Sequence, residues 1–298
     1  MPDIARQPRA TLQILQLKQG TIAVCICLVT VTSTAVVSTM PDNASYQQKK
    51  AFFDRVLTVY GRKPVLEAIR DDTLSCHALH LAQSNRNAGI IDEISQLAVS
   101  RNVPIKLHPR NELARISKNA KQDQGVALDI LCPAFGALDD YLAEAATGAH
   151  RRLLALDGIS NPQNLGMIVR SATAGNIDGI IWSRRGNAAL GPLVIKASAG
   201  TLYRAPLLFC ASLPEALRSC RVRGMEICTL DAGATRTLFE HRPSGDCVYV
   251  LGNETGGISE TVSQLADTPL SIPMGNGVES LNVAVTASLI AYANYLDR

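Results

Sequence analysis

The sequence is poor in aromatic residues and in net charge. Aromatic side chains make up 4% of its 298 residues, and the excess of positive charge is only +3. A chain that binds nucleic acid over its whole surface would be strongly basic, so any such binding must depend on local clusters of positive charge. With 47% hydrophobic and 18% charged residues, the chain is globular and has room for two domains.

The cysteines and histidines lack the spacing of a metal site. None of the eight cysteines forms a CxxC pair, and the five histidines show no ligand spacing. The pattern therefore indicates neither a zinc site nor a disulfide framework, and we predict no metal. Reduced thiols are typical of cytosolic proteins, which favours a cytoplasmic location.

Charged residues are absent from one long stretch, residues 21–40. It is long enough to cross a bilayer, but its many threonines and serines make it a poor membrane helix. A signal peptide is a second reading, although the compact charged start is lacking. The third reading, an unfolded or misassigned leader with Met40 as an alternative start, is the one we favour, so we expect residues 1–50 to lie outside the folded domains and do not expect a membrane.

A small α/β domain is expected over residues 51–135, after a polar linker at 42–50. Residues 89–101 carry isoleucines, leucine and alanine on one face, which predicts an amphipathic helix. Further helices are expected at 63–70 and 111–117, and strands at 77–82, 104–107 and 126–131.

Residues 136–150 are expected to form a linker with a short helical stretch at 138–146. From residue 151 to 298, strands and helices alternate, which predicts a mainly parallel sheet with helices on both faces. The expected strands are 153–156, 179–183, 206–209, 226–230, 248–251 and 270–272, and the expected helices are 163–174, 192–199, 214–223, 260–265 and 281–296.

Three polar segments that contain glycine stand where strands of this second domain should meet helices. They run from Asn161 to Arg170, from Leu251 to Ser259 and from Ile272 to Asn282. Because ligands bind beyond the carboxyl ends of the strands of an α/β sheet, we predict that the three segments form one composite site. The glycine-rich segment lacks the lysine of a P-loop and the GxGxxG spacing, so phosphate cradling is not expected there.

Local signals predict how two of these segments enter helices. Asn161 is a good N-cap and Pro162 is tolerated at the first helical position. Ser280 is likewise expected to cap the last helix. Asn164 falls at the start of the helix expected at 163–174, six residues before Arg170; a loop position for Asn164 would let the two converge on one ligand.

The order and residues of the three segments resemble the motifs of the SpoU (TrmH) branch of the SPOUT RNA methyltransferases, from about residue 153 to the C-terminus. The resemblance implies an α/β domain whose mainly parallel sheet is tied in a trefoil knot, and a homodimer that forms through this domain. It also implies that S-adenosylmethionine is the cofactor and that a ribose 2′-hydroxyl in ribosomal or transfer RNA is methylated. Residues 51–135 resemble the ribosomal-protein-like substrate-binding domain of such enzymes, with Gly61 near the start and Gln124-Gly125 before the last strand.

The resemblance assigns roles residue by residue. Cofactor binding is implied for four residues, with Ile272 and Leu281 acting mostly through their backbone: Gly252, Gly256, Ile272 and Leu281. The catalytic residues that it implies are Asn164, Arg170, Glu254, Ser280 and Asn282.

Arg170 has two readings. Its apolar neighbours Ile168, Val169 and Ala172 predict a largely buried helix, and a buried arginine needs a polar or anionic partner. Residue type alone favours a structural salt bridge, to Glu254 or an aspartate, whereas the resemblance implies a catalytic residue. Because a guanidinium is a poor base, our hypothesis is that Arg170 orients the ribose and its phosphate. Glu254 or a phosphate oxygen of the substrate would then take the proton.

RNA recognition is expected in the first domain, which is locally basic. Tyr60, Phe52 and Phe53 are the few aromatic candidates for base stacking, although the two phenylalanines are better placed in a core. Two rival functions stay open: a catalytically inactive RNA-binding protein with the same fold, and a membrane-anchored protein that uses residues 21–40. The basic residues are Arg62, Lys63, Arg86, Lys106, Arg110, Arg115, Lys118 and Lys121.

Overall fold

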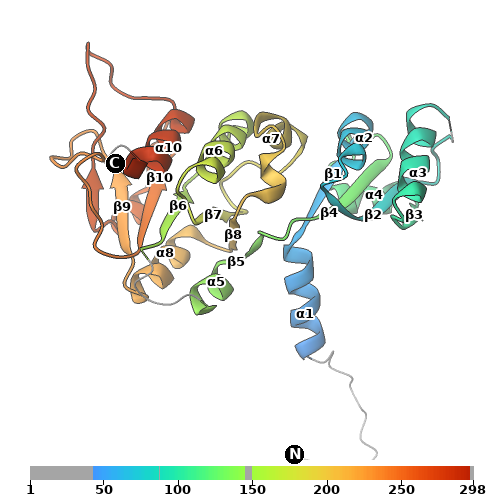
Figure 1. The fold of residues 1–298 in the computed structure, drawn as a ribbon, viewed down its shortest axis with the longest axis horizontal. Coiled ribbons are helices and arrows are strands. Elements are labelled where there is room, and N and C mark those ends of the chain that lie inside the picture. The colour runs from blue at the N-terminus through green and yellow to red at the C-terminus, as the bar shows by residue number, and fades with distance from the viewer. Residues whose placement is uncertain (1–42, 87, 145–149, 296–298) are drawn as a thin grey trace, which may run out of the picture. The chain divides into compact units, whose positions relative to one another are not determined.

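The structure is a computed structural model that describes residues 43–86, 88–144 and 150–295 (Figure 1). The uncharged stretch 21–40, and with it the choice between leader, signal peptide and anchor, lies outside these residues. Within the described ranges, no helix has both the length and the apolar character needed to cross a membrane.

The first part of the chain forms a four-stranded sheet in the order β1-β4-β2-β3. β4 pairs antiparallel with β1 and β2, and β3 pairs parallel with β2. The elements are α1 (Asn43–Asp54), β1 (Val56–Tyr60), α2 (Arg62–Arg70), β2 (Ser75–Ala82), α3 (Ile90–Ser100), β3 (Ile105–His108), α4 (Arg110–Ser117) and β4 (Val126–Leu131).

Most of these elements lie where the sequence predicted them, with two differences. The predicted amphipathic helix is α3, which buries Ile91, Ile94 and Ala98 on one face. The polar linker predicted at 42–50 is wrong, because α1 covers residues 43–54. β1 was not predicted, although the alternating burial of its five residues is the usual signature of a strand with one buried face.

The second part forms a seven-stranded sheet in the order β11-β9-β10-β6-β7-β8-β5. Every neighbouring pair is parallel, as the alternation of elements predicted. The elements are β5 (Gly136–Ala137), α5 (Leu138–Glu144), β6 (Arg152–Leu156), α6 (Pro162–Ala174), β7 (Gly179–Ser183), α7 (Pro192–Ala197), η1 (Thr201–Arg204), β8 (Leu207–Cys210), α8 (Leu213–Val222), β9 (Glu226–Leu230), β10 (Cys247–Leu251), α9 (Glu260–Ser263), β11 (Thr268–Leu270), α10 (Val283–Tyr292) and η2 (Ala293–Tyr295).

Helices cover both faces of this sheet. In Figure 1, α6, α7 and α10 lie on one face, and α5 and α8 lie on the other. All five residues of β6 and of β10 are therefore buried, which explains why these strands read as continuous apolar runs rather than alternating ones. β5 and α5 fall in the stretch expected to be a linker, and β5 pairs with β8 at the edge of the sheet.

Two predicted boundaries near the C-terminus are wrong. The strand expected at 270–272 is β11, at Thr268–Leu270. The helix expected from residue 281 begins at Val283, and its N-cap is Asn282 rather than Ser280. The reason is local: the Asn282 side-chain oxygen accepts a hydrogen bond from the backbone N–H of Ala284 at 2.8 Å.

The order of the strands reverses beside β6, and this reversal positions the site. The chain runs from β6 outward through β7 to β8, and later returns to place β10 and β9 on the other side of β6. In parallel α/β sheets, ligands bind beyond the carboxyl ends of the strands at such a point. The first two of the polar segments follow β6 and β10.

α6 and α10 pack closely against each other on one face of the sheet (Figure 1). Gly175, at the end of α6, lies against Ala291 of α10, and a Cβ atom placed on Gly175 would come within 2.6 Å of the Ala291 Cβ. The next residue, Asn176, donates its backbone N–H to the Ala291 carbonyl at 2.9 Å. Only a residue without a side chain fits at this crossing.

We expect Gly175→Ala to destabilise the protein by about 1–3 kcal/mol, because the new methyl group would push α6 and α10 apart. The φ angle of Gly175 is −94°, so backbone strain would not contribute. The measurement is urea unfolding followed by circular dichroism. Gly245→Ala is the control, because nothing lies within 4 Å of the added atom there. Equal unfolding midpoints for the two variants would contradict the close crossing.

Candidate active site

The loop after β6 leads into α6 through a capped first turn. The Asn161 side chain accepts hydrogen bonds from the backbone N–H groups of Gln163, at 2.8 Å, and Asn164, at 3.4 Å. With Pro162 at the first helical position, this start agrees with the sequence prediction. Asn164 lies in the first turn of the helix, within the range that the sequence predicted to be helical and not in a loop, and 7% of its surface is exposed.

The loop after β10 is a tight hairpin. Asn253 and Gly257 exchange two backbone hydrogen bonds of 2.9 Å, and Glu254 lies at the turn between them. The Asn253 side-chain oxygen also accepts from the backbone N–H of Thr255 at 2.8 Å. A Cβ atom on Gly252 would lie 2.3 Å from the Gly257 carbonyl carbon, so the hairpin can close only over a glycine.

Two hydrogen bonds hold the β10 hairpin against the loop after β6. The Asn253 side chain donates to the Gly158 carbonyl at 2.7 Å, and the backbone N–H of Ser259 donates to the Asp157 carboxylate at 2.7 Å. Sequence reasoning assigned no role to Asn253 or Asp157. Only their position in the sequence could have indicated a role, because Asp157 lies within two residues of the end of β6 and Asn253 within two residues of the end of β10.

A chain of side-chain hydrogen bonds joins three residues that the sequence selected. The Asn164 amide donates to the Glu254 carboxylate. In turn, the Asn282 amide donates to the Asn164 side-chain oxygen at 3.2 Å. The three polar segments therefore meet in one place, as predicted. Glu254 is exposed, so its carboxylate faces solvent while one of its oxygens is held.

Arg170 lies elsewhere on α6. It is exposed, and it forms no hydrogen bond or ion pair with another described residue. The prediction of a buried arginine with a salt bridge to Glu254 or an aspartate is therefore wrong. On a helix with 3.6 residues per turn, Arg170 shares an outward face with Gln163 and Met167, while Ile168 and Val169 point inward.

The remaining candidate residues line the edge of this region. Ser280 is exposed and forms no hydrogen bond within the described part of the chain. Ile272 packs against the core, and Leu281 is 37% exposed. The peptide groups of Gly252, Ile272 and Leu281 form no hydrogen bonds with described residues, and a side chain on Gly256 would meet open space. Backbone groups without hydrogen-bond partners suit a ligand that is recognised mainly through the backbone.

Comparison with known proteins identifies the family. The SpoU rRNA Methylase family matches residues 151–292, and a second family, described as RNA 2′-O ribose methyltransferase substrate binding, matches residues 58–131. A protein of Mycolicibacterium smegmatis (strain ATCC 700084 / mc(2)155), named an uncharacterized tRNA/rRNA methyltransferase, is 36% identical over 83% of this chain and 79% of its own length. The chain belongs to the SpoU methylase family. A protein of Mycobacterium sp. (strain KMS) with the same name is also 36% identical, over 80% of this chain and 75% of its own.

Solved SpoU methyltransferases share the fold. AviRb from Streptomyces viridochromogenes, in a complex with AdoMet, superposes with a TM-score of 0.55 at 21% identity, covering 86% of this chain and 99% of that one. The AdoMet-bound rRNA methyltransferase from Sinorhizobium meliloti gives 0.56 at 18% identity, covering 85% and 90%. The α/β architecture inferred from the sequence is thus that of SpoU methyltransferases.

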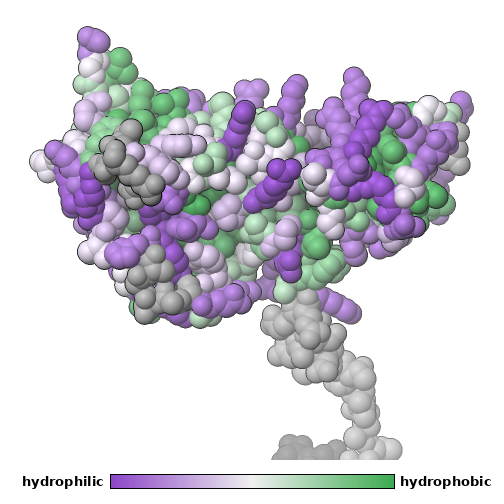
Figure 2. Space-filling model, in the orientation of Figure 1, coloured by the Kyte–Doolittle hydropathy of each residue, from purple (hydrophilic) through white to green (hydrophobic). Residues whose placement is uncertain are grey.

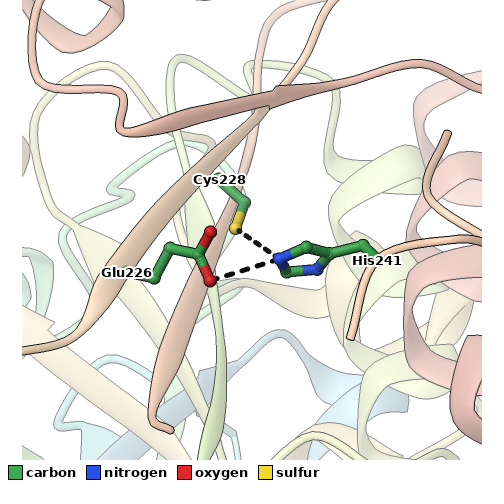
Figure 3. Close-up of side chains that lie close together, drawn as sticks. All are labelled: Glu226, Cys228 and His241. Atoms are coloured by element: carbon green, nitrogen blue, oxygen red, sulfur yellow. Dashed lines mark hydrogen bonds and ion pairs between the residues drawn. The ribbon is translucent and has the colours of Figure 1, made fainter. Parts of the chain in front are cut away.

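A second polar cluster in this SpoU domain involves a histidine (Figure 3). His241 Nε2 lies 3.2 Å from the Glu226 carboxylate and 3.8 Å from the Cys228 sulfur. His241 Nδ1 lies 3.1 Å from the Tyr249 hydroxyl. This cluster was not predicted from the sequence, because Glu226 and His241 are 15 residues apart and Tyr249 follows 8 residues later.

The three donor atoms lie within 4.8 Å of one another, close enough for a metal ion to be considered. Burial, however, raises the pKa of the Cys228 thiol well above its ordinary value, so the sulfur stays protonated and is a poor ligand. The positive charges of Arg236 and Arg152 also act at His241, where they lower its pKa and would repel a cation. The cluster is better explained as a hydrogen-bonded support between β9, β10 and the loop that joins them.

We expect His241 to make stability depend on pH. Burial lowers its pKa below 6.5, although Glu226 opposes the shift. Below pH 6.5 the unfolded chain therefore binds a proton that the folded chain does not, and stability falls as the pH decreases. The free energy of unfolding in urea should drop more between pH 7.5 and 5.5 for the wild type than for His241→Gln. Parallel pH dependences in the two proteins would show that His241 is not the titrating group.

Proposed function

We propose that this SpoU-family protein methylates a ribose 2′-hydroxyl in ribosomal or transfer RNA, with S-adenosylmethionine as cofactor. The observation that carries the proposal is the chain of hydrogen bonds from Asn282 through Asn164 to Glu254, beside the point where the order of the strands reverses. Matches to both a methylase family and a family for 2′-O ribose substrates support it. Mapping the modified nucleotide in RNA from a strain that lacks the protein tests the choice of ribose.

The cofactor would be held by Gly252, Gly256, Ile272 and Leu281. The peptide groups of Gly252, Ile272 and Leu281 have no hydrogen-bond partner among the described residues, and a side chain on Gly256 would meet open space, which supports this assignment. When bound, S-adenosylmethionine would supply a methyl group on a sulfonium: the hydroxyl oxygen would bond to the methyl carbon in line as the sulfur–methyl bond breaks, and the neutral thioether S-adenosylhomocysteine would leave. No metal is needed for this chemistry.

Glu254 is the proposed acceptor of the 2′-hydroxyl proton. Asn164 donates to one carboxylate oxygen, which leaves the other free to accept. The carboxylate is exposed, so a bound ribose can reach it. Positioning of the reactants could lower the barrier by about 7–11 kcal/mol. We assign Ser280 and Asn282 to the surroundings of the reacting groups, with Asn282 also orienting Asn164.

Arg170 is proposed to orient the ribose and its phosphate. Its guanidinium has no partner among the described residues, which leaves its donors available to an anionic ligand. It stays protonated at neutral pH and so does not serve as the base.

The exposed face of α6 and the segment before α10 support a homodimer. Apolar side chains are open to solvent on α6, on this segment and on α10 itself: Met167 is 41% exposed, Val278 50% and Val285 48%. Figure 2 shows hydrophobic residues gathered at the upper left, near the segment between β11 and α10. Contiguous exposed apolar surface commonly marks an interface, and we propose that a second copy covers it. Arg170 on this face would then reach the Glu254 of the other copy.

The chain is proposed to divide into an RNA-binding domain, residues 51–135, and a methyltransferase domain, residues 151–298, that β5 and α5 join at the sheet edge. The return of the chain to place β10 between β9 and β6 is compatible with a trefoil knot. A cytoplasmic location would supply both cofactor and RNA. The inactive RNA-binding alternative predicts cofactor binding without methylation of bulk RNA.

Glu254→Gln should lower the rate of methyl transfer by roughly 10²–10⁴-fold, because the amide cannot take the proton. Affinity for S-adenosylmethionine, measured by calorimetry, should be unchanged. Glu260→Gln removes an exposed carboxylate nearby and is the matched control. Full activity in Glu254→Gln, together with its loss in Arg170→Lys, would remove Glu254 from the proton transfer.

A mixing experiment tests whether two chains complete one site. Arg170→Ala and Glu254→Gln should each be inactive alone. After unfolding and refolding as an equimolar mixture, half of the dimers would contain both variants, each with one intact site, so about a quarter of wild-type activity should return. If no activity returns while mixed dimers form, both residues act within the same chain.

A further inference from the structure

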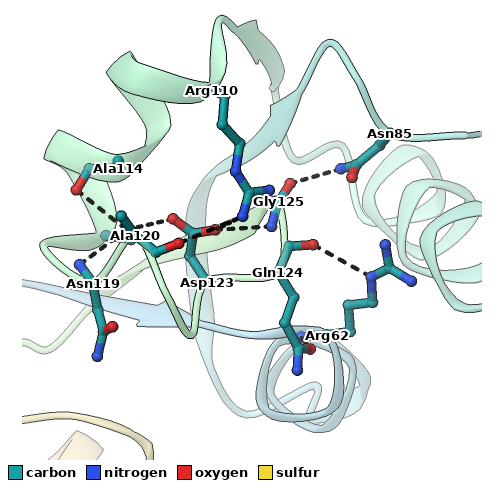
Figure 4. Close-up of polar contacts among 10 residues, drawn as sticks. Arg62, Asn85, Arg110, Ala114, Asn119, Ala120, Asp123, Gln124 and Gly125 are labelled. Carbon is teal, nitrogen blue, oxygen red and sulfur yellow. Dashed lines mark hydrogen bonds and ion pairs between the residues drawn. The ribbon is translucent and has the colours of Figure 1, made fainter.

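A polar hollow of about 570 Å³ lies in the first domain, away from the candidate active site. It is lined by Arg62, Ser84, Asn85, Arg110 and Gln124. Arg62 and Arg110 are the first residues of α2 and α4, and the other residues belong to the loops after β2 and before β4. Figure 4 shows the two arginine side chains reaching the segment Gln124-Gly125 from different elements.

The backbone of the hollow is unusual. Gln124 has a φ angle of 52° and Gly125 one of 79°, so two successive residues are left-handed. A Cβ atom on Gly125 would lie 2.4 Å from the Asn85 side-chain oxygen and 3.1 Å from Arg110 Nη1. Glycine therefore permits Asn85 and Arg110 to converge. Strained backbone of this kind is concentrated at binding sites, where the surrounding structure holds it in place.

A buried carboxylate holds the lining of the hollow in place through its contacts. Asp123 is fully buried and accepts hydrogen bonds of 2.9 Å from the Ser117 hydroxyl and from the backbone N–H of Gly125. It also pairs with Arg110 Nη2 at 3.2 Å, while half of the Arg110 side chain stays exposed. Asp123 thus holds the Arg110 guanidinium on its buried side, and the rest of that group faces solvent.

The groups left unpaired are mainly donors. Arg62 gives its Nε to the Gln124 carbonyl at 3.3 Å, and its two terminal nitrogens have no partner among the described residues. Arg110 Nε and Nη1 and the Gln124 amide nitrogen are likewise without hydrogen bonds there. Such a set requires an acceptor-rich, anionic ligand, and guanidinium groups match phosphate oxygens in geometry as well as charge.

We propose that this hollow binds the phosphodiester backbone of the RNA substrate and so positions the RNA for the distant active site. The inference rests on the proposed function, because it takes RNA to be the substrate. Three more exposed basic residues lie within a few positions of the lining residues in the sequence and add positive charge: Lys63, Arg86 and Lys121. Contacts to phosphates set register and affinity without reading sequence, so the hollow supplies positioning rather than base choice.

The test is the binding of bulk ribosomal and transfer RNA, isolated from a strain that lacks the protein, to the full chain with S-adenosylmethionine present. Filter binding over a range of KCl concentrations gives affinity and its salt dependence. Arg62→Ala should weaken binding about 10-fold and reduce the slope of log affinity against log salt by roughly 0.7–0.9, the loss of one phosphate contact. Arg110→Lys keeps a charge beside Asp123, so that the domain still folds, and should also weaken binding.

Arg55→Ala is the matched control, since Arg55 is an exposed arginine of the same domain outside the hollow. It should change RNA affinity less than twofold. Equal losses for Arg62→Ala and Arg55→Ala would reveal a diffuse basic surface and overturn the proposal, as would an unchanged salt slope in Arg62→Ala. A wild-type protein that binds this RNA but transfers no methyl group would refute the proposed reaction, while the comparison of variants would still decide the role of the hollow.

Discussion

The close approach of α6 and α10 sets the geometry of the candidate active site. Small residues make the approach possible: Gly175 meets Ala291 at one end, and the Ser288 and Ser171 hydroxyls are 2.8 Å apart in the middle. At the other end, the same crossing brings Asn282 within hydrogen-bonding distance of Asn164. A bulkier contact anywhere along the pair would separate the two asparagines, because packed helices move as rigid units.

A buried arginine holds the far end of this helix pair. Arg152, at the start of β6, donates to the Ile290 carbonyl at 2.6 Å and to the Asn176 carbonyl at 3.2 Å. A positive charge at the last turn of α10 also complements the helix dipole. The guanidinium lies 5.3 Å from the centre of the Tyr249 ring, and the Tyr249 hydroxyl contacts His241. Strand β10, which leads to Glu254, is thereby connected to the end of α10.

The sequence predicted the large sheet well, since buried parallel strands read as apolar runs separated by helices. It also selected the segments that meet at Asn164, Glu254 and Asn282. It failed where tertiary contacts choose between similar local signals. Ser280 and Asn282 are both good caps, and the contact with Asn164 favours the second. Arg170 has apolar neighbours in the sequence, yet the helical repeat places it on the outer face of α6. Its exposure therefore depends on its position around the helix and not on the residues next to it.

The orientation of one amide group links these features to chemistry. The Asn164 side-chain nitrogen donates to Glu254 and its oxygen accepts from Asn282, so an amide turned by 180° would lose both hydrogen bonds. This fixes one oxygen of the Glu254 carboxylate and leaves the other toward solvent. A carboxylate in water is a weak base, and it becomes a more effective acceptor when a ligand excludes water around it. In the proposed reaction, the bound RNA would therefore complete the environment in which Glu254 accepts its proton, and a site that stays open in the free protein would react only when that RNA is in place.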